Sequence, residues 1–267
     1  MTDARRAIFL DVDGTYALHG RVPDAHVGAV RAARAAGHKV FLCTGRPVSA
    51  LPHSLTGAGF DGYVCAAGAY AEIDGESIVD VNFEPDAAAR LLALLDEHGV
   101  QYIVENSHQL LLRRDADHLM RRALGAYGGE NAELLIEVVD DLKGLPVAKV
   151  ICFGGDSKLA EIITPLGPSF AVIPNSIPDL GEGAGEVYQS RINKAVGIAA
   201  VIEALGKTRD QVVAFGDGLN DVEMLEFAAV SVAIEGSHPR VMAAATHTAA
   251  GPEVAGLANA FAELGLT

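Results

Sequence analysis

The chain has 267 residues, half of them hydrophobic, which is enough to bury a substantial core and argues against a largely disordered protein. Twenty basic residues against thirty-five acidic residues leave a formal net charge of −15 at pH 7, so the surface repels nucleic acid and anionic membranes at long range. No apolar run reaches about 18 residues, and residues 1–14 lack the pattern of a signal peptide, so we expect neither a membrane-spanning helix nor a secretory leader.

The first part of the chain alternates apolar runs with helical patterns. Apolar runs of strand length stand at Ala7–Leu10, Lys39–Cys43 and Tyr63–Ala66. A helical pattern opened by Pro23 and Asp24 and stopped by Gly37 separates the first two, and a second at Ser49–Leu55 separates the last two. Alternation of this kind predicts a parallel sheet covered by helices.

From residue 70 the pattern changes. The strands Tyr70–Ile73 and Ser77–Val81 flank Asp74-Gly75, a strong hairpin signal. Further strands are expected at Val100–Glu105, Gln109–Arg113, Ala148–Phe153 and Ser169–Ile173. Helices are expected from Pro85 to about His98, at Asp115–Tyr127 and at Asp156–Leu166. This mixture predicts a separate α+β unit.

The alternating arrangement returns from Asn193. The expected elements are helices at Lys194–Leu205, Val222–Phe227 and His238–Ala244 and strands at Val212–Phe215 and Val230–Ile234. The chain is therefore predicted to be one α/β domain, formed by residues 1–82 and 188–267, with a second domain at 83–187 inserted into it. These boundaries carry a margin of several residues.

Three predicted strands end in polar sequences. These are Asp11-Val-Asp13-Gly-Thr15, Thr44-Gly45-Arg46 and Gly216-Asp217-Gly-Leu-Asn220-Asp221. In an open parallel sheet, ligands bind at the carboxyl ends of the strands, so we expect all three sequences at one rim. Taken singly, each could be an ordinary turn, and Asn220 or Asp221 could simply cap a helix.

Four of these residues are acidic: Asp11, Asp13, Asp217 and Asp221. Carboxylates this close together repel one another unless a cation neutralises them or one of them holds a proton. A hard divalent cation with oxygen ligands resolves the repulsion, and Mg²⁺ suits a site that must also hold phosphate. Zinc would prefer histidine or cysteine, and neither occurs in these sequences.

Phosphate could be held by other residues of the same motifs. Thr44 offers a hydroxyl donor, and Gly45 allows a ligand to approach the backbone closely. Lys194 begins a predicted helix, where a cation gains nothing from the helix dipole, so it either faces bound phosphate or is an ordinary solvated lysine. Arg46 either grips a substrate phosphate or is solvated at the rim.

Other polar features have ordinary interpretations. The nine histidines show no metal-ligand spacing and are taken as surface or helix-end residues. Gly181-Glu-Gly183-Ala-Gly185 lacks the context of a nucleotide-binding loop and is taken as a hinge or turn. Cys43, Cys65 and Cys152 lie far apart in apolar segments, which fits reduced thiols of a cytoplasmic protein.

Together the motifs resemble those of the haloacid dehalogenase superfamily, specifically its Cof-like members with a large α/β cap. The resemblance covers essentially the whole chain: DVDGT at 11–15, TGR at 44–46, Lys194 in RINKAVGI and GDGLNDVEML at 216–225 match the four family motifs in order. The tail AAVSVAIEGSHPRVMAAATHTA is similar to the family's closing strand and helix. The resemblance implies a Rossmann-like core with an inserted, mobile cap.

The resemblance also implies roles. Asp11 would attack phosphorus and form an aspartyl-phosphate, and Asp13 would protonate the leaving oxygen and then activate water. Mg²⁺ would be held by Asp11, the backbone carbonyl of Asp13 and Asp217, with support from Asp221. The phosphate would be held by the remaining motif residues, Thr44, Gly45, Lys194 and Asn220.

Two positions depart from the family pattern. Tyr16-Ala17 replaces two bulky aliphatic residues, and Ala67-Gly68-Ala69 replaces Asn-Gly-Ala. Both departures leave the residues of the proposed reaction unchanged, so they affect only which residues are expected to contact the substrate. Within the insert, the polar candidates for contacting substrate are His108, Arg113, Arg114 and Glu186, although such residues are more often solvated at the surface.

The expected function is hydrolysis of small phosphorylated metabolites, sugar phosphates among them. A phosphomutase and a non-catalytic protein that binds a phosphorylated ligand are the alternatives. The expected partner is a small phosphorylated metabolite rather than nucleic acid or a membrane, and the oligomeric state cannot be read from the sequence.

Overall fold

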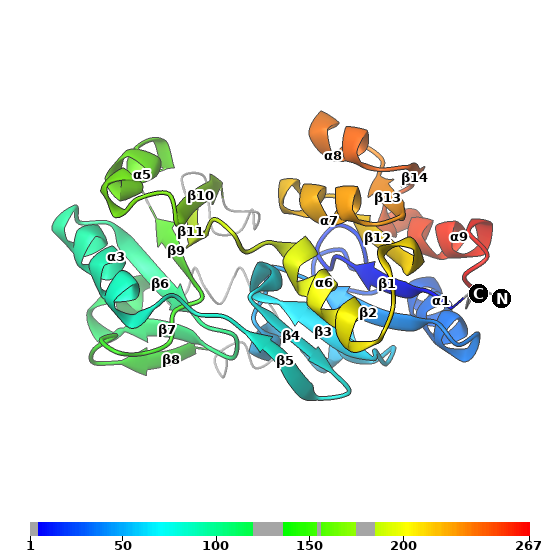
Figure 1. Cartoon of the computed structure of the whole chain (residues 1–267), viewed down its shortest axis with the longest axis horizontal. Helices are drawn as coiled ribbons and strands as arrows, with labels where there is room; N and C mark the ends of the chain where they lie inside the picture. Colours follow the sequence, from blue (N-terminus) through cyan, green and yellow to red (C-terminus); the bar gives the residue numbers. More distant parts are fainter. Residues whose placement is uncertain (1–4, 120–135, 154–155, 175–184) are drawn as a thin grey trace. The chain divides into compact units, whose positions relative to one another are not determined.

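A computed structural model of the chain describes residues 5–119, 136–153, 156–174 and 185–267. It divides into two compact units (Figure 1). The core unit comprises Met1–Arg46, Leu51–Asp80 and Asn193–Thr267, and the inserted unit comprises Pro47–Ala50 and Val81–Ile192. No helix in the described ranges combines the length and apolar character that crossing a membrane requires.

The core unit is built on an eight-stranded sheet in the order β14-β13-β12-β1-β2-β3-β4-β5. Its strands are β1 (Ala7–Leu10), β2 (Lys39–Cys43), β3 (Gly62–Cys65), β4 (Tyr70–Ile73), β5 (Glu76–Asp80), β12 (Val212–Gly216), β13 (Val230–Ile234) and β14 (His247–Ala249). The strands from β14 to β3 run parallel, and β4 and β5 continue the sheet antiparallel. The predicted α/β class with a parallel sheet is confirmed.

Helices cover both faces of this sheet because alternate residues of each strand point to opposite sides. They are α1 (Asp24–Ala35), α2 (His53–Thr56), α6 (Lys194–Ala204), α7 (Val222–Phe227), α8 (Pro239–Ala244) and α9 (Gly256–Glu263). Ile8 and Leu10 of β1 pack in the cluster that includes α1 and α9. Phe9, between them, packs in the cluster that includes α6, α7 and α8. The central strand is therefore apolar at every position.

The inserted unit has a six-stranded sheet in the order β10-β11-β9-β6-β7-β8. Its elements are α3 (Pro85–Glu97), β6 (Gln101–Glu105), β7 (Leu110–Arg113), β8 (Ile136–Val139), β9 (Lys149–Phe153), α5 (Asp156–Ile163), β10 (Phe170–Pro174) and β11 (Gly185–Gln189). All pairs are antiparallel except β7 with β8. Leu91 and Leu95 of α3 pack with Val104 and Val150 of the sheet.

Several local expectations were wrong. Ser49–Leu55 is not one helix: a 3₁₀ turn at Val48–Ala50 and the short α2 stand on either side of Pro52, since proline disfavours helical geometry in the residue before it. The 3₁₀ turn belongs to the inserted unit, where the amide of Val48 donates to the carbonyl of Ser107 (2.9 Å). The sequence did not predict the strands β8, β11 and β14 or the helix α9.

Two expectations fall partly outside the described residues. Of the helix predicted at Asp115–Tyr127, the structure describes a 3₁₀ segment at Arg114–Leu119, and residues 120–127 lie outside. Residues 181–184 of the glycine-rich sequence also lie outside, whereas Gly185 begins β11. The hairpin at Asp74-Gly75 is confirmed, and both residues have the positive φ (51° and 84°) that a type I′ turn requires.

His26 stands in the first turn of α1, a helix-end position as predicted, yet it is buried rather than at the surface. It lies in α1, is 0% exposed, and its Nδ1 is 2.9 Å from the carbonyl oxygen of Tyr16. Burial lowers the pKa of His26, while its bond to Tyr16 acts in the opposite direction. The folded protein therefore favours the neutral imidazole.

We expect the free energy of unfolding to carry a pH-dependent contribution from His26. Its unfolded pKa is about 6.5 and its folded pKa is lower, so the unfolded chain binds more protons as the pH falls below about 6.5 and stability decreases. Urea denaturation of wild type and His26→Gln at pH 7 and pH 5 measures this contribution as the difference between the two proteins. An identical change in both proteins would contradict the assignment.

Candidate active site

The first motif begins where β1 ends. The amide of Asp11 donates to the carbonyl of Phe215 (2.9 Å), so the backbone pairing between β1 and β12 extends one residue beyond Leu10. Asp11 is 7% exposed, and Asp217 follows the last residue of β12. Two neighbouring parallel strands thus deliver carboxylates from opposite ends of the chain to one edge of the sheet.

Lys194 lies among these carboxylates. It is 0% exposed, and its Nζ lies 2.5 Å from Oδ1 of Asp11 and 2.5 Å from Oδ1 of Asp221. Burial disfavours the charged ammonium, but Asp11 and Asp221 outweigh burial and raise the pKa of Lys194. The alternative of an ordinary solvated lysine is therefore wrong.

Three carboxylates share this site. Asp11, Asp217 and Asp221 each place an oxygen so that all three oxygens lie within 4.8 Å of one another. Burial, and next the charge of Asp221, raise the pKa of Asp11. Burial also raises the pKa of Asp217 to about 6, although a hydrogen bond from Thr15 lowers it. When all three carboxylates are ionised, one ammonium leaves two negative charges, and the donors are all oxygens, so the residues fit a hard divalent cation.

Asp221 also fixes the loop that carries Asp217. Its Oδ2 accepts from the amides of Asp217 (3.0 Å) and Gly218 (2.8 Å). The Asp221 side chain does not cap α7. Thr15 Oγ1 donates to Oδ1 of Asp217 (2.7 Å), so the first motif holds the fourth directly. The sequence contained Thr15 within DVDGT, but nothing in its spacing revealed this contact.

The side chain of Asp13 does not belong to the group formed by Asp11, Asp217 and Asp221. Arg46 grips its carboxylate through Nε and Nη2, each 2.7 Å from a different oxygen. Arg46 is buried, with 7% of its side chain exposed, against 43% for Asp13. Both expectations for Arg46, a phosphate grip or a solvated rim residue, miss this contact. A bidentate pair fixes the plane of the Asp13 carboxyl group.

The phosphate candidates surround the same edge. Thr44 directly follows β2 and is 2% exposed, and its Oγ1 accepts from the amide of Arg46 (3.1 Å). Gly45 and Asn220 are partly exposed. The core unit therefore contains every residue proposed for the site, and β1, β2, β12 and α6 position them.

The turn at Ala66–Gly68 holds the start of α6 in place. Its three residues all have positive φ (48°, 53° and 99°), an uncommon conformation for alanine. The amide of Ala67 donates to the carbonyl of Thr44 (3.1 Å). A Cβ on Gly68 would lie 2.0 Å from the carbonyl oxygen of Asn193, the residue before Lys194. From the sequence, Ala67-Gly68-Ala69 stood out only as a departure from the family pattern, and this contact with α6 was not predicted.

Gly68→Ala should therefore impair catalysis without touching a motif residue. The added methyl group must displace the start of α6, and shifts of about 1 Å near a reacting centre can cost about 10²-fold in turnover. Gly75→Ala is the matched control, because Gly75 also has positive φ (84°) but has no atom within 4 Å of the Cβ position. Equal activity in the two variants would contradict this role for Gly68.

The polar candidates in the insert lie apart from these motifs in sequence. Glu186 is buried, not solvated, and binds the buried Lys149 (3.1 Å). Arg113 pairs with Asp96 and Asp115, and the exposed Arg114 pairs with Asp140. His108 is exposed. A role for any of them in substrate binding stays a prediction.

Three comparisons place this chain among known proteins. The sequence model of the haloacid dehalogenase-like hydrolases matches residues 8–261. YkrA of Bacillus subtilis, which bears a provisional phosphatase name, is 27% identical over 98% of each chain. The pyridoxal phosphate phosphatase YbhA of Escherichia coli is 24% identical over 90% of this chain and 91% of its own. The solved structure of the HAD subclass IIB sugar phosphatase BT4131 has a TM-score of 0.81 and 25% identity, covering 98% of this chain and all of the other.

Proposed function

The chain belongs to the haloacid dehalogenase-like hydrolases, and on that premise we propose that it is a magnesium-dependent phosphatase of small phosphate monoesters, with Asp11 as nucleophile. The observation that carries the proposal is the group formed by the buried Asp11 and Asp221, the partly exposed Asp217 and the buried Lys194 at the ends of β1 and β12. Phosphoryl transfer depends mainly on positioning and on neutralising charge, and this group provides fixed charges of both signs.

In the proposed first step, an oxygen of Asp11 forms a bond to phosphorus as the bond to the leaving oxygen breaks. Asp13 gives its proton to that leaving oxygen, so the alcohol departs neutral. In the second step, Asp13 takes a proton from water, the water oxygen attacks phosphorus, and the bond to Asp11 breaks to release inorganic phosphate. A carboxylate nucleophile thus divides one difficult displacement into two easier ones.

The other residues of the site would bind the phosphate and orient the reacting groups. Lys194 would neutralise a phosphate oxygen, and Thr44, the amide of Gly45 and Asn220 would donate hydrogen bonds to the remaining oxygens. Arg46 binds both oxygens of the Asp13 carboxylate, so one of these contacts would open when Asp13 takes up the proton that it gives. Asp11, Asp217 and the backbone carbonyl of Asp13 would hold Mg²⁺, supported by Asp221, and the ion would supply neutralisation of the transferring phosphoryl group.

The substrate class proposed is a small monoester, with sugar phosphates first. The strongly negative chain disfavours nucleic acid as a partner, so the positive charge for phosphate must be local, as it is at Lys194. The relatives named for pyridoxal phosphate and for sugars support small substrates. Cys43, Cys65 and Cys152 are buried and form no disulfide in the described part of the chain, which fits a reducing compartment, for which we propose the cytoplasm.

Phosphate release from a panel of sugar phosphates, pyridoxal phosphate, nucleotides and a chromogenic monoester tests the proposal. We expect release that disappears on chelation and returns on adding Mg²⁺, because the carboxylate group otherwise carries two uncompensated negative charges. Release that is undiminished by chelation would contradict the metal requirement. Conversion of a sugar phosphate to its isomer without free phosphate would identify a phosphomutase instead.

A further inference from the structure

A cavity of about 460 Å³ lies in the core unit at the end of α1 and the start of β2. Its lining includes the cationic side chains of Arg31, Arg34 and Lys39 and one carboxylate, Asp61. Lys39 is the first residue of β2, whereas Thr44 follows the last, so the cavity lies at the opposite end of the strands from the candidate active site. Its volume is within the range of small-molecule pockets.

Asp61 is already fully hydrogen-bonded. It accepts from Nε and Nη2 of Arg34 (2.9 and 3.2 Å), from Nζ of Lys39 (2.9 Å) and from the amide of Val40 (2.9 Å). Burial alone would raise the pKa of Asp61, but these donors lower it, so the carboxylate stays ionised. Four donors match the acceptor capacity of a carboxylate. Asp61 therefore neutralises one of the three cations.

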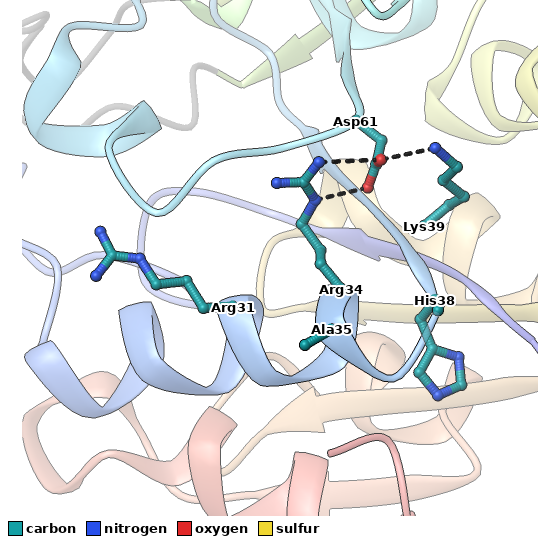
Figure 2. Close-up of a pocket in the computed structure, with 7 residues that line it drawn as sticks. Arg31, Arg34, Ala35, His38, Lys39 and Asp61 are labelled. Carbon is teal, nitrogen blue, oxygen red and sulfur yellow. Dashed lines mark hydrogen bonds and ion pairs between the residues drawn. The ribbon is translucent and has the colours of Figure 1, made fainter.

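The remaining positive charge belongs to side chains that line the cavity. Within the described part of the chain, Arg31 donates to one acceptor, the carbonyl of Gly57 (3.0 Å), although a guanidinium has five N–H donors. Figure 2 shows Asp61 between Arg34 and Lys39, with Arg31 on the same helix and no contact drawn from it to Asp61. Arg34 and Lys39 keep 37% and 39% of their side chains exposed. Asp74, which is outside the lining, also acts on Arg34.

Stabilisation of the fold explains only part of the positive charge at this cavity. Arg31 and Arg34 are three residues apart near the carboxyl end of α1, where cations favour the helix dipole, and Asp61 joins α1 to the starts of β2 and β3. Neither role uses the donors of Arg31 that remain, nor the cavity beside them. The residues that line the cavity also carry a net charge of +2, whereas the whole chain carries a net charge of −15.

We propose that this cavity is a binding site for a small polyvalent oxyanion, bearing phosphate or carboxylate groups, separate from the candidate active site. Arg31 presents a fork suited to two oxygens of one such group, and Arg34 and Lys39 hold further donors at fixed positions set by Asp61. The negative charge of the ligand offsets the excess of three cationic side chains over one carboxylate.

Titration of the full chain with pyrophosphate and with citrate, in buffer containing a chelator, tests the proposal by calorimetry. We expect binding that Arg31→Ala weakens by about tenfold or more, because one bidentate charge-assisted contact is lost. Arg114→Ala is the matched control, since Arg114 is also an exposed arginine but lies outside the cavity. The stronger of the two probes assigns phosphate or carboxylate groups to the ligand.

Arginine-specific labelling with phenylglyoxal, read by peptide mass spectrometry, locates the site. We expect the saturating anion to slow modification of Arg31 several-fold and to leave Arg114 unchanged. Circular dichroism of Arg31→Ala checks that the surface substitution leaves the fold intact. Equal affinity in wild type and Arg31→Ala, or labelling of Arg31 that neither anion slows, overturns the proposal. Binding that depends on Lys194 but not on Arg31 also overturns it, by placing the anion in the candidate active site.

Discussion

Replacing Asp11 with asparagine is expected to lower phosphate release by at least about 10³-fold while leaving the core unit folded. The amide cannot form the bond to phosphorus, and Asp221 cannot replace Asp11, since its carboxylate is held by two backbone amides. Single-turnover measurement of released phosphate gives the size of the loss.

The same variant should not lose stability in the absence of metal. Burial and the charge of Asp221 raise the pKa of Asp11, which means that the fold disfavours its charged form. A neutral amide of the same size removes that penalty, although it also weakens the contact with Lys194. We expect a midpoint of urea unfolding equal to or above that of wild type.

Asp210→Asn is the control for the Asp11 substitution, because Asp210 is exposed and lies outside the motifs. It should retain both activity and stability. Full activity in Asp11→Asn would remove the proposed nucleophile. A folded Asp11→Asn that binds phosphate without turnover, beside an equally inactive wild type, would favour a ligand-binding protein.

Replacing Lys194 with methionine should abolish activity and also destabilise the core unit by about 3–5 kcal/mol at neutral pH without metal. The lysine lies between Asp11 and Asp221 with no exposed surface, so its removal leaves buried carboxylates without a counter-charge. Addition of Mg²⁺ should recover part of the stability but not the activity. Urea denaturation with and without Mg²⁺ measures both effects.

Two further variants separate charge from packing at Lys194. Lys194→Met combined with Asp221→Asn should be more stable than Lys194→Met alone, because one uncompensated charge is gone. Lys158→Met, at an exposed position of α5, should change stability little. If the Lys194→Met variant has wild-type stability in the absence of metal, the buried ion pairs are not what holds this site together.

The parallel sheet could be predicted because its strands carry strong local signals. β2 and β13 have the predicted limits, since each is an apolar run bounded by polar or turn residues. The hairpin at Asp74-Gly75 followed from two residues that tolerate positive φ. The gathering of the polar motifs at one edge of the sheet could be predicted from topology, because the carboxyl ends of parallel strands lie at the same edge.

What the sequence could not show depends on contacts between distant segments. Lys194 meets Asp11 across 183 positions, and its burial depends on loops after β1 and β12. The pairing of Arg46 with Asp13 likewise has no local signal. The burial of His26 could have been predicted, since it stands three, four and seven residues before the buried Ala29, Val30 and Ala33 of α1.

The strand order of the core unit also dictates when it can be completed during synthesis. β1 is made first, yet one of its two partners is β12, whose residues leave the ribosome about 200 positions later. Until then β1 is an open edge, which other strands can pair with. All residues of the inserted unit, by contrast, have been made by Ile192, before β12 begins. The inserted unit is thus able to fold first, although it interrupts the core unit in sequence. One edge of β1 stays unpaired, and open to mispairing, until β12 has been synthesised.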